Sequence, residues 1–197
     1  MPSVFTHAVA AAALGTLIVP GRGRLLALGA ACAVLPDADV VAFFLDLPYR
    51  GMLGHRGLSH SIPFAAALAV VLTWLARRRS RGDGPPGAVR LGAFLFLATA
   101  SHGLLDALTD GGLGVAFWAP LSDARHFLPW RPIAVAPISA RRFFSSEGLP
   151  VIASEIAVVW IRPRSCARPR SRSGGGAGPP LQPERAPGGP GVSRCGR

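Results

Sequence analysis

The sequence contains few cysteines and few charged residues. Its three cysteines form neither a CxxC nor a CxxH pattern, so neither a thiolate zinc site nor a disulfide framework is indicated. Charged residues make up only 16% of the 197 positions, whereas hydrophobic residues make up 50%, and the mean hydropathy is +0.38. This composition is more apolar than that of an ordinary soluble domain and favours a membrane protein.

Strand-like alternation of polar and apolar residues is also missing. Apolar segments rich in Ala, Leu and Val instead cover residues 4–19, 25–47, 62–76, 91–108 and 151–161. Their length and lack of alternation predict helices. We therefore expect an all-α, membrane-embedded bundle of about four to five apolar helices over residues 1–161. Several segments are shorter than the roughly 20 residues that a bilayer crossing needs, so a soluble, tightly packed helical protein is the alternative.

The basic residues are all arginines, and they are concentrated at the C-terminal end. The formal net charge is +11, but eight of the 21 arginines follow Ile161, where the only acidic residue is Glu184. Residues 162–197 consist largely of Arg, Pro, Gly and Ser and have little to bury, which predicts a disordered tail. Its abrupt change of composition fits either a native tail that contacts anionic lipids or a frame-shifted gene end. Because the basic excess lies there, we expect no specific binding of nucleic acid.

The remaining arginines predict a membrane topology. Arg22 and Arg24 separate the first two apolar segments, and four further arginines lie within residues 77–81. The positive-inside tendency places both loops in the cytoplasm. The N-terminal segment has no basic residue before its apolar stretch and contains His7, so we expect it to be retained rather than cleaved as a signal peptide. The predicted localisation is multi-pass in the inner (plasma) membrane.

Ionisable residues recur in or beside the apolar segments. Such residues are costly there unless they pair, line a cavity or form a site. With both arginine loops inside, the helical rise of 1.5 Å per residue places them at a similar depth, roughly 18 to 24 Å from the inner helix ends. His102 and Asp106 are four residues apart and share a helix face. "LPDAD" adds two carboxylates beside a helix-breaking proline, and "GHRGLSHS" adds two histidines and an arginine.

These side chains predict a metal centre. Mixed His and Asp ligands suit zinc or another divalent transition ion. We expect a divalent metal, with zinc the best match, to be held by a subset of His7, Asp39, His60, His102 and Asp106. Asp37 and His55 are candidates for general base or acid, and Arg56 for a bidentate grip on a phosphate or carboxylate. The pattern does not determine which residue is a ligand and which is the base.

Each motif also has a simpler interpretation. His7 can be an interfacial residue, "LPDAD" can form a turn and a helix cap, and Arg56 can anchor lipid headgroups. The shared depth of these residues favours one site. Farther along, the aromatic residues between 118 and 130 predict a loop at the membrane surface, whose Asp123, Arg125 and His126 either contact substrate or take no part in the chemistry.

Five motifs together carry a family resemblance. They are "THAVAAAALG", "LPDAD", "GHRGLSHS", "SHGLLDALTDGG" and "PLSDARHFLPWRPIAVAPIS". In this order, over about residues 2–161, they resemble the YdjM-like family of inner-membrane-associated, metal-dependent hydrolases, a family also labelled LexA-binding. The resemblance implies a helical, membrane-embedded hydrolase with a distant similarity to zinc-dependent phospholipase C-like proteins. It points to His7, Asp37, Asp39, His55, His60, His102 and Asp106 as site residues. The tail has no counterpart in the family.

The predicted function is hydrolysis of a phosphoester or lipid-like substrate through a metal-activated water. Membrane lipids are the expected partners. The main alternative is a non-catalytic membrane protein whose metal site holds the helices together while its loops recruit a partner. A transporter is a weaker alternative, because the sequence shows no internal repeat.

Overall fold

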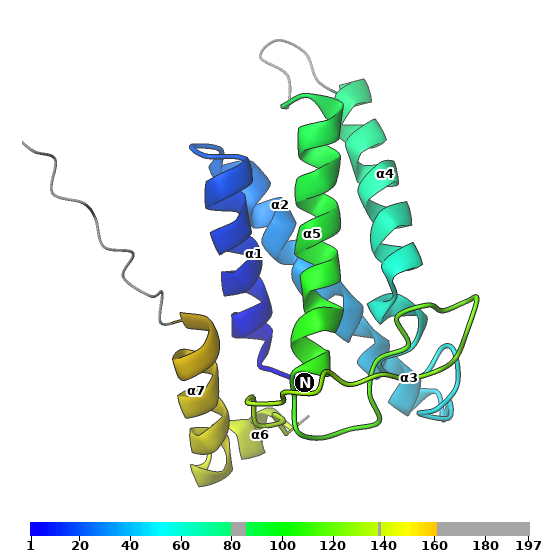
Figure 1. Cartoon of the computed structure of the whole chain (residues 1–197), viewed down its shortest axis with the longest axis vertical. Helices are drawn as coiled ribbons and strands as arrows, with labels where there is room; N and C mark the ends of the chain where they lie inside the picture. The colour runs from blue at the N-terminus through cyan, green and yellow to red at the C-terminus, as the bar shows by residue number, and fades with distance from the viewer. Residues whose placement is uncertain (80–85, 138, 161–197) are drawn as a thin grey trace, which may run out of the picture. The chain divides into compact units, whose positions relative to one another are not determined.

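The computed structural model describes residues 1–79, 86–137 and 139–160. Four long helices form the framework: α1 (Val4–Ile18), α2 (Gly23–Val34), α4 (Ile62–Arg79) and α5 (Ala88–Ala107). α5 packs against the other three, and Figure 1 shows it between α1 and α4. No β-strand occurs in these three described ranges, which confirms the all-α prediction. The predicted disordered tail, residues 162–197, lies outside the described residues.

Small residues let three helices approach one another around Phe94 of α5. Gly15 of α1 and Gly29 of α2 both face its ring, and a Cβ atom at Gly29 would lie only 2.2 Å from Cζ of Phe94. Small residues at helix crossings allow this close approach in membrane proteins. His7 lies about two turns before Gly15 on α1, and His102 lies about two turns after Phe94 on α5. This core therefore fixes the two helices from which the histidines project.

The second apolar segment is not one regular helix. After α2 the chain continues as a 3₁₀ turn, η1 (Leu35–Val40), and then as the short helix α3 (Val41–Phe44). Pro36 is the second residue of the 3₁₀ turn. Proline cannot donate the helical hydrogen bond, and its ring crowds the preceding turn. The structure thus confirms the predicted break at "LPDAD". The tighter turn buries Asp37.

The number of candidate membrane helices is smaller than predicted. Within the described residues, only Gly23–Phe44 and Ala88–Ala107 are long and apolar enough to cross a membrane. α1 has only 15 residues, and α4 ends in the three arginines at 77–79. The prediction of four to five such helices is wrong because apolar composition extends into helices that are too short, or too charged at one end, to span a bilayer.

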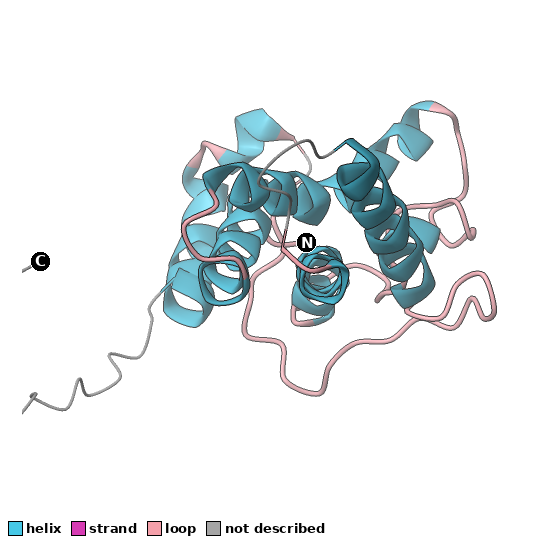
Figure 2. Ribbon diagram, turned by 90° about the horizontal axis from the view of Figure 1, so that it is seen from above, coloured by secondary structure: helices cyan, strands magenta, loops and turns pink. Residues whose placement is uncertain are grey.

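The segment after α5 returns across the end of the bundle as a long loop. It leads to α6 (Ala140–Phe143), η3 (Ser146–Gly148), α7 (Leu149–Glu155) and the π-helical turn η4 (Ile156–Trp160). Figure 2 shows the connecting loops passing outside the long helices. The buried Glu155 carboxylate of α7 accepts hydrogen bonds from the hydroxyls of Ser3 at 2.6 Å and Thr6 at 2.8 Å. α7 is therefore tied to the start of α1.

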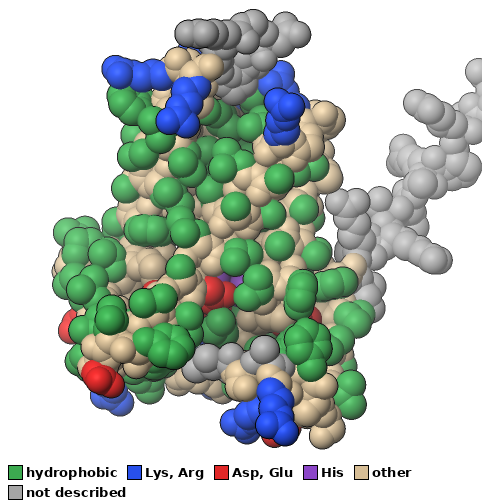
Figure 3. All heavy atoms as spheres, turned by 180° about the vertical axis from the view of Figure 1, so that it is seen from behind, with side chains coloured by type: hydrophobic (Ala, Val, Ile, Leu, Met, Phe, Trp, Pro, Cys, Tyr) green, Lys and Arg blue, Asp and Glu red, His purple; other side chains and the backbone are tan. Residues whose placement is uncertain are grey.

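Hydrophobic side chains also cover much of the outer surface. Leu17, Phe44, Val70 and Val89 are all more exposed than buried. Figure 3 shows such side chains across the middle of one face, with arginines gathered toward its two ends. An apolar band between charged ends is the surface that a protein presents to lipid.

Candidate metal centre

The "GHRGLSHS" segment folds into a tight turn that requires two of its glycines. A Cβ atom at Gly54 would lie 2.3 Å from the carbonyl oxygen of Pro48, and one at Gly57 would lie 2.2 Å from that of Met52. Between them Arg56 has a φ of 62°, a left-handed conformation that is uncommon for a residue with a side chain. Such conformations cluster at functional sites, where the surrounding structure holds them.

The end of this turn starts helix α4. A 3₁₀ turn, η2 (Leu58–His60), leads to Ser61, whose hydroxyl accepts a hydrogen bond of 3.1 Å from the amide of Phe64. Ser61 therefore acts as the N-terminal cap of α4. The cap fixes where the helix begins and leaves His60 buried just before it.

The structure brings the eight predicted site residues together. They come from α1, η1, the turn before α4, and α5, and comprise His7, Asp37, Asp39, His55, Arg56, His60, His102 and Asp106. Among the described residues, their imidazoles and carboxylates form three groups with metal-ligand spacing: His7, His102 and Asp106; Asp37, His60 and His102; and Asp39, His55 and His60. His102 belongs to the first two groups and His60 to the last two. Buried His and Asp groups that could hold a metal ion are therefore present, as predicted.

Four side chains bring ligand atoms to the middle of this cluster. Nε2 of His60 lies 3.0 Å from Nε2 of His102 and 3.2 Å from Oδ2 of Asp106. Oδ1 of Asp37 lies 3.4 Å from the same His102 nitrogen. In a tetrahedral zinc site, bonds of about 2.0–2.1 Å place the ligand atoms roughly 3.3 Å apart. These three separations are close to that value, whereas Nε2 of His102 and Oδ2 of Asp106 lie 3.9 Å apart.

The ring orientations of the two central histidines also suit a metal. Nδ1 of His102 lies 2.6 Å from the carbonyl oxygen of Ala33, which can only accept, so this nitrogen carries the proton. The lone pair of its Nε2 therefore points at Nε2 of His60. Two such nitrogens at 3.0 Å need a proton or a cation between them.

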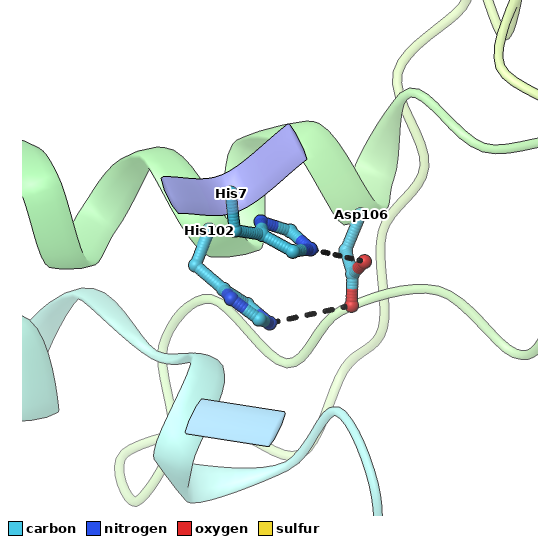
Figure 4. Close-up of side chains that lie close together, drawn as sticks. All are labelled: His7, His102 and Asp106. Atoms are coloured by element: carbon cyan, nitrogen blue, oxygen red, sulfur yellow. Dashed lines mark ion pairs between the residues drawn. The ribbon is translucent and has the colours of Figure 1, made fainter. Parts of the chain in front are cut away.

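His7 extends the cluster toward α1. Its ring stacks on that of His102, with centroids 3.7 Å apart, and its Nε2 lies 3.8 Å from Oδ1 of Asp106. Figure 4 shows both rings directed at this carboxylate. Within the described part of the chain, neither the ring nitrogens of His7 nor the carboxylate oxygens of Asp37 make a hydrogen bond. Because buried polar atoms normally have partners, these atoms are well suited to ligate an ion.

Asp39 differs from Asp37 in its bonding. Its carboxylate lies 2.5 Å from Nδ1 of His55 and accepts hydrogen bonds of 2.6 Å from the Ser59 hydroxyl and 3.1 Å from the Arg56 amide. It also lies 3.1 Å from Nδ1 of His60. A carboxylate in this position orients histidines whose other nitrogen faces the metal. The carboxylate oxygens of Asp37 are thus open to a metal, while those of Asp39 are occupied by histidine, serine and amide partners. The sequence alone predicts Asp39 as a ligand and Asp37 as a candidate base or acid.

Arg56 is buried, and its guanidinium is held inside the protein by one ion pair and two hydrogen bonds. Nε lies 3.1 Å from Oδ2 of Asp106, while Nη1 donates to the carbonyl of Gly111 at 3.0 Å and Nη2 to the hydroxyl of Thr109 at 3.1 Å. This arrangement holds the Asp106 carboxylate in place. It supports a positioning role more directly than the predicted grip on an anion.

The charge balance of the cluster favours a cation at its centre. Burial disfavours protonation of His60, but the carboxylates of Asp106 and Asp39 outweigh burial and raise the His60 pKa to about 9. These carboxylates stabilise positive charge at this position, and a divalent ion satisfies the same requirement as a proton.

The structure adds Arg125 to the residues that support the site. The sequence alone leaves the role of its loop open. Its guanidinium donates to the carbonyls of Tyr49 at 2.9 Å, His55 at 3.0 Å and Gly51 at 3.3 Å. It therefore clamps the turn that carries His55. The neighbouring His126 instead pairs its backbone with Val115 and belongs to none of the three ligand groups found among the described residues. No local spacing links residue 125 to residues 49–55, so the sequence offered no signal for this clamp.

Comparison with known proteins places the chain in the inner membrane. It matches the family model described as YdjM inner membrane protein over residues 1–165. Over 165 residues it is 40% identical to the inner membrane protein YbcI of Escherichia coli (strain K12), a match that covers 82% of this chain and 92% of that protein. No solved structure matches the chain significantly.

Proposed function

This chain belongs to the YdjM inner membrane protein family, and we propose that it is a membrane-bound, metal-dependent hydrolase that cleaves a phosphoester. The observation that carries the proposal is the cluster around Nε2 of His102, which lies 3.0 Å from His60, 3.4 Å from Asp37 and 3.9 Å from Asp106. The His55–Asp39 pair lies beside it. A metal site next to an oriented histidine is the arrangement that metal-assisted hydrolysis requires.

The residues of the cluster divide into holding and orienting groups. His60, His102, Asp37 and Asp106 would hold a divalent ion, for which zinc fits the mixed N and O donors, and His7 is a further donor. When bound, the ion would lower the pKa of a coordinated water toward neutrality and polarise a phosphoryl oxygen. Arg56 keeps the Asp106 carboxylate in position, and Asp39 fixes the rings of His55 and His60.

His55 is the residue best placed to move protons. Its Nδ1 is bound to Asp39, which leaves Nε2 as the working nitrogen, and it lines a cavity of about 290 Å³ together with Tyr49 and Arg56. During hydrolysis the water oxygen bonds to phosphorus, and one water proton passes to His55. The ester P–O bond breaks, and the departing oxygen takes that proton. The products are an alcohol and the phosphate.

A phosphoesterase assay with and without metal tests this proposal. Detergent-purified protein is stripped of metal, reloaded with zinc or another divalent ion, and offered mono- and diesters of phosphate. We expect activity only after reloading. His55→Gln should keep its metal but lose activity by about 10²–10⁴-fold, whereas the matched control His126→Gln should leave both unchanged. Metal-loaded wild-type protein that hydrolyses none of these esters would refute the proposal.

A non-catalytic metal site is the second candidate. One observation favours it: the ligand groups join α1, η1, η2 and α5, so an ion bound there would tie these elements together. This alternative predicts that chelation lowers the melting temperature while no ester is cleaved under any metal condition.

A further inference from the structure

An apolar pocket adjoins the metal centre. Its volume is about 340 Å³, and it is lined by Asp37 of the cluster and by hydrophobic residues of α1, η1 and the end of α6 with the residue after it. They include Val4, Phe5, Val40, Phe143 and Phe144. The metal centre and the apolar cavity therefore meet at residue Asp37, whose carboxylate oxygens are themselves buried.

The residues of this pocket are also accessible from outside. Phe144 is 76% exposed, Phe5 57% and Val4 44%. Figure 3 shows acidic and histidine atoms visible between hydrophobic side chains in the middle of one face. In a protein of the inner membrane such apolar side chains meet lipid rather than water, so a molecule dissolved in the membrane can reach the pocket.

A second cavity adjoins the first and has a different character. It is the cavity of about 290 Å³ that contains His55, Arg56 and Tyr49, and it shares Met1, Ala136 and Pro137 with the apolar pocket. Residues of the metal cluster therefore line two cavities: the apolar pocket, which includes Asp37, and the polar cavity, which includes His55 and Arg56. An amphiphilic molecule matches this pair of environments.

We propose that the apolar pocket binds an acyl chain of a membrane lipid whose phosphoester lies at the metal centre. The proposal rests on the proposed function and specifies its substrate class. A hydrocarbon chain matches this apolar lining. The C-terminal residues 162–197 match it poorly as an alternative occupant, because they are rich in Arg, Pro, Gly and Ser. Another apolar groove of about 610 Å³, between α4 and α5, includes Val89 but no residue of the metal cluster, and so provides a control.

The first test compares long-chain and short-chain phosphoesters that share one headgroup. We expect wild-type protein to prefer the long-chain ester by about tenfold or more in kcat/KM, since burial of two methylene groups is enough for that factor. Val4→Trp fills the pocket and should remove this preference while the short-chain rate stays the same. The matched control Val89→Trp, also in the first turn of an apolar helix, should retain the preference.

A second pair of variants covers the other wall of the pocket. Phe144→Ser should weaken long-chain cleavage alone, while Phe44→Ser, at a residue that is also strongly exposed but lies outside the pocket, should not. Equal rates for long and short chains in wild-type protein would overturn the proposal. So would a pocket variant with normal metal content that lowers both rates by the same factor.

A binding experiment separates this proposal from the proposed function. A phosphodiester lipid with a photoactivatable group in one acyl chain is irradiated with the full chain in detergent micelles, and the labelled peptides are identified by mass spectrometry. We expect labelling of residues 1–5 and 143–144 that decreases in Val4→Trp but not in Val89→Trp. Such labelling without hydrolysis would support the pocket and refute only the hydrolase. Labelling that avoids these residues, or is the same in Val4→Trp, would refute the pocket.

Discussion

Asp37 and Asp39 lie two positions apart in one motif, yet their surroundings differ. The oxygens of Asp37 make no hydrogen bond within the described residues and face His102, whereas Asp39 is bonded to His55, Ser59 and the Arg56 amide. An orienting carboxylate contributes less to metal affinity than a ligand does. The two aspartates therefore have separable roles in the proposed site.

Amide substitutions at the two positions test this division. Asp37→Asn should abolish stoichiometric metal binding, because a ligand and a negative charge are lost together. Asp39→Asn should still bind metal, with an affinity lower by about 10–100-fold. Metal titration of the stripped proteins measures both affinities. Equal losses in the two variants would contradict the assignment.

Metal binding should also depend on pH. In the metal-free protein, Asp106 and Asp39 overcome the effect of burial and raise the His60 pKa to about 9, so His60 carries a proton below that pH. A metal ion must displace this proton. Affinity should therefore rise with pH up to about 9, by up to about tenfold per pH unit, and level off above it. Calorimetry in buffers of different ionisation enthalpy should detect the released proton; an affinity that is constant below pH 9 would contradict this prediction.

Among the elements, the turn before α4 depends on a residue from a distant loop. Arg125 binds three carbonyls of residues 49–55 at once, which only a planar, multi-donor guanidinium achieves. Arg125→Lys should therefore loosen this turn, increase amide hydrogen exchange of residues 49–57, and weaken metal binding several-fold. Arg142→Lys, whose exposed guanidinium pairs only with Glu147 among the described residues, is the control. Unchanged exchange in Arg125→Lys would show that the clamp is dispensable.

A second contact between elements ties α7 to α1 near His7. Glu155 accepts hydrogen bonds from the Ser3 amide and from the hydroxyls of Ser3 and Thr6. Glu155→Gln places a donor against these donors and should cost about 1–3 kcal/mol. At about 2–4 °C per kcal/mol for a chain of this size, thermal unfolding in detergent should detect the loss. Glu147→Gln, on the exposed Arg142 pair, should leave the melting temperature unchanged. Equal melting temperatures for both variants would contradict the proposed tie.

At the scale of the whole molecule, the sequence predicted the helical class and the depth of residues along each helix, because both follow from regular repeats along the chain. Apolar segments without alternation predicted helices, and a constant rise per residue predicted that His7, His102 and Asp106 lie at a common depth. The structure confirms the all-α class and brings these residues together. The family comparison confirms the inner membrane, while the multi-pass topology stays a prediction.

Other features depend on local geometry or on distant contacts that the sequence does not reveal. The different surroundings of Asp37 and Asp39 arise from the 3₁₀ turn Leu35–Val40 that contains Pro36. The clamp by Arg125 joins residues about 70 positions apart in loops. The number of candidate membrane helices depends on where each helix ends, which apolar composition alone does not determine.

The central claim is that a divalent metal is held at the point where His60 and His102 meet. Elemental analysis of detergent-purified protein tests it most directly, with His102→Ala compared to the matched control His126→Ala. We predict stoichiometric metal, zinc in preference to other divalent ions, in wild-type protein and in His126→Ala, and little or none in His102→Ala. A folded wild-type protein without metal, or a His102→Ala variant with the same metal content as wild type, would contradict the account.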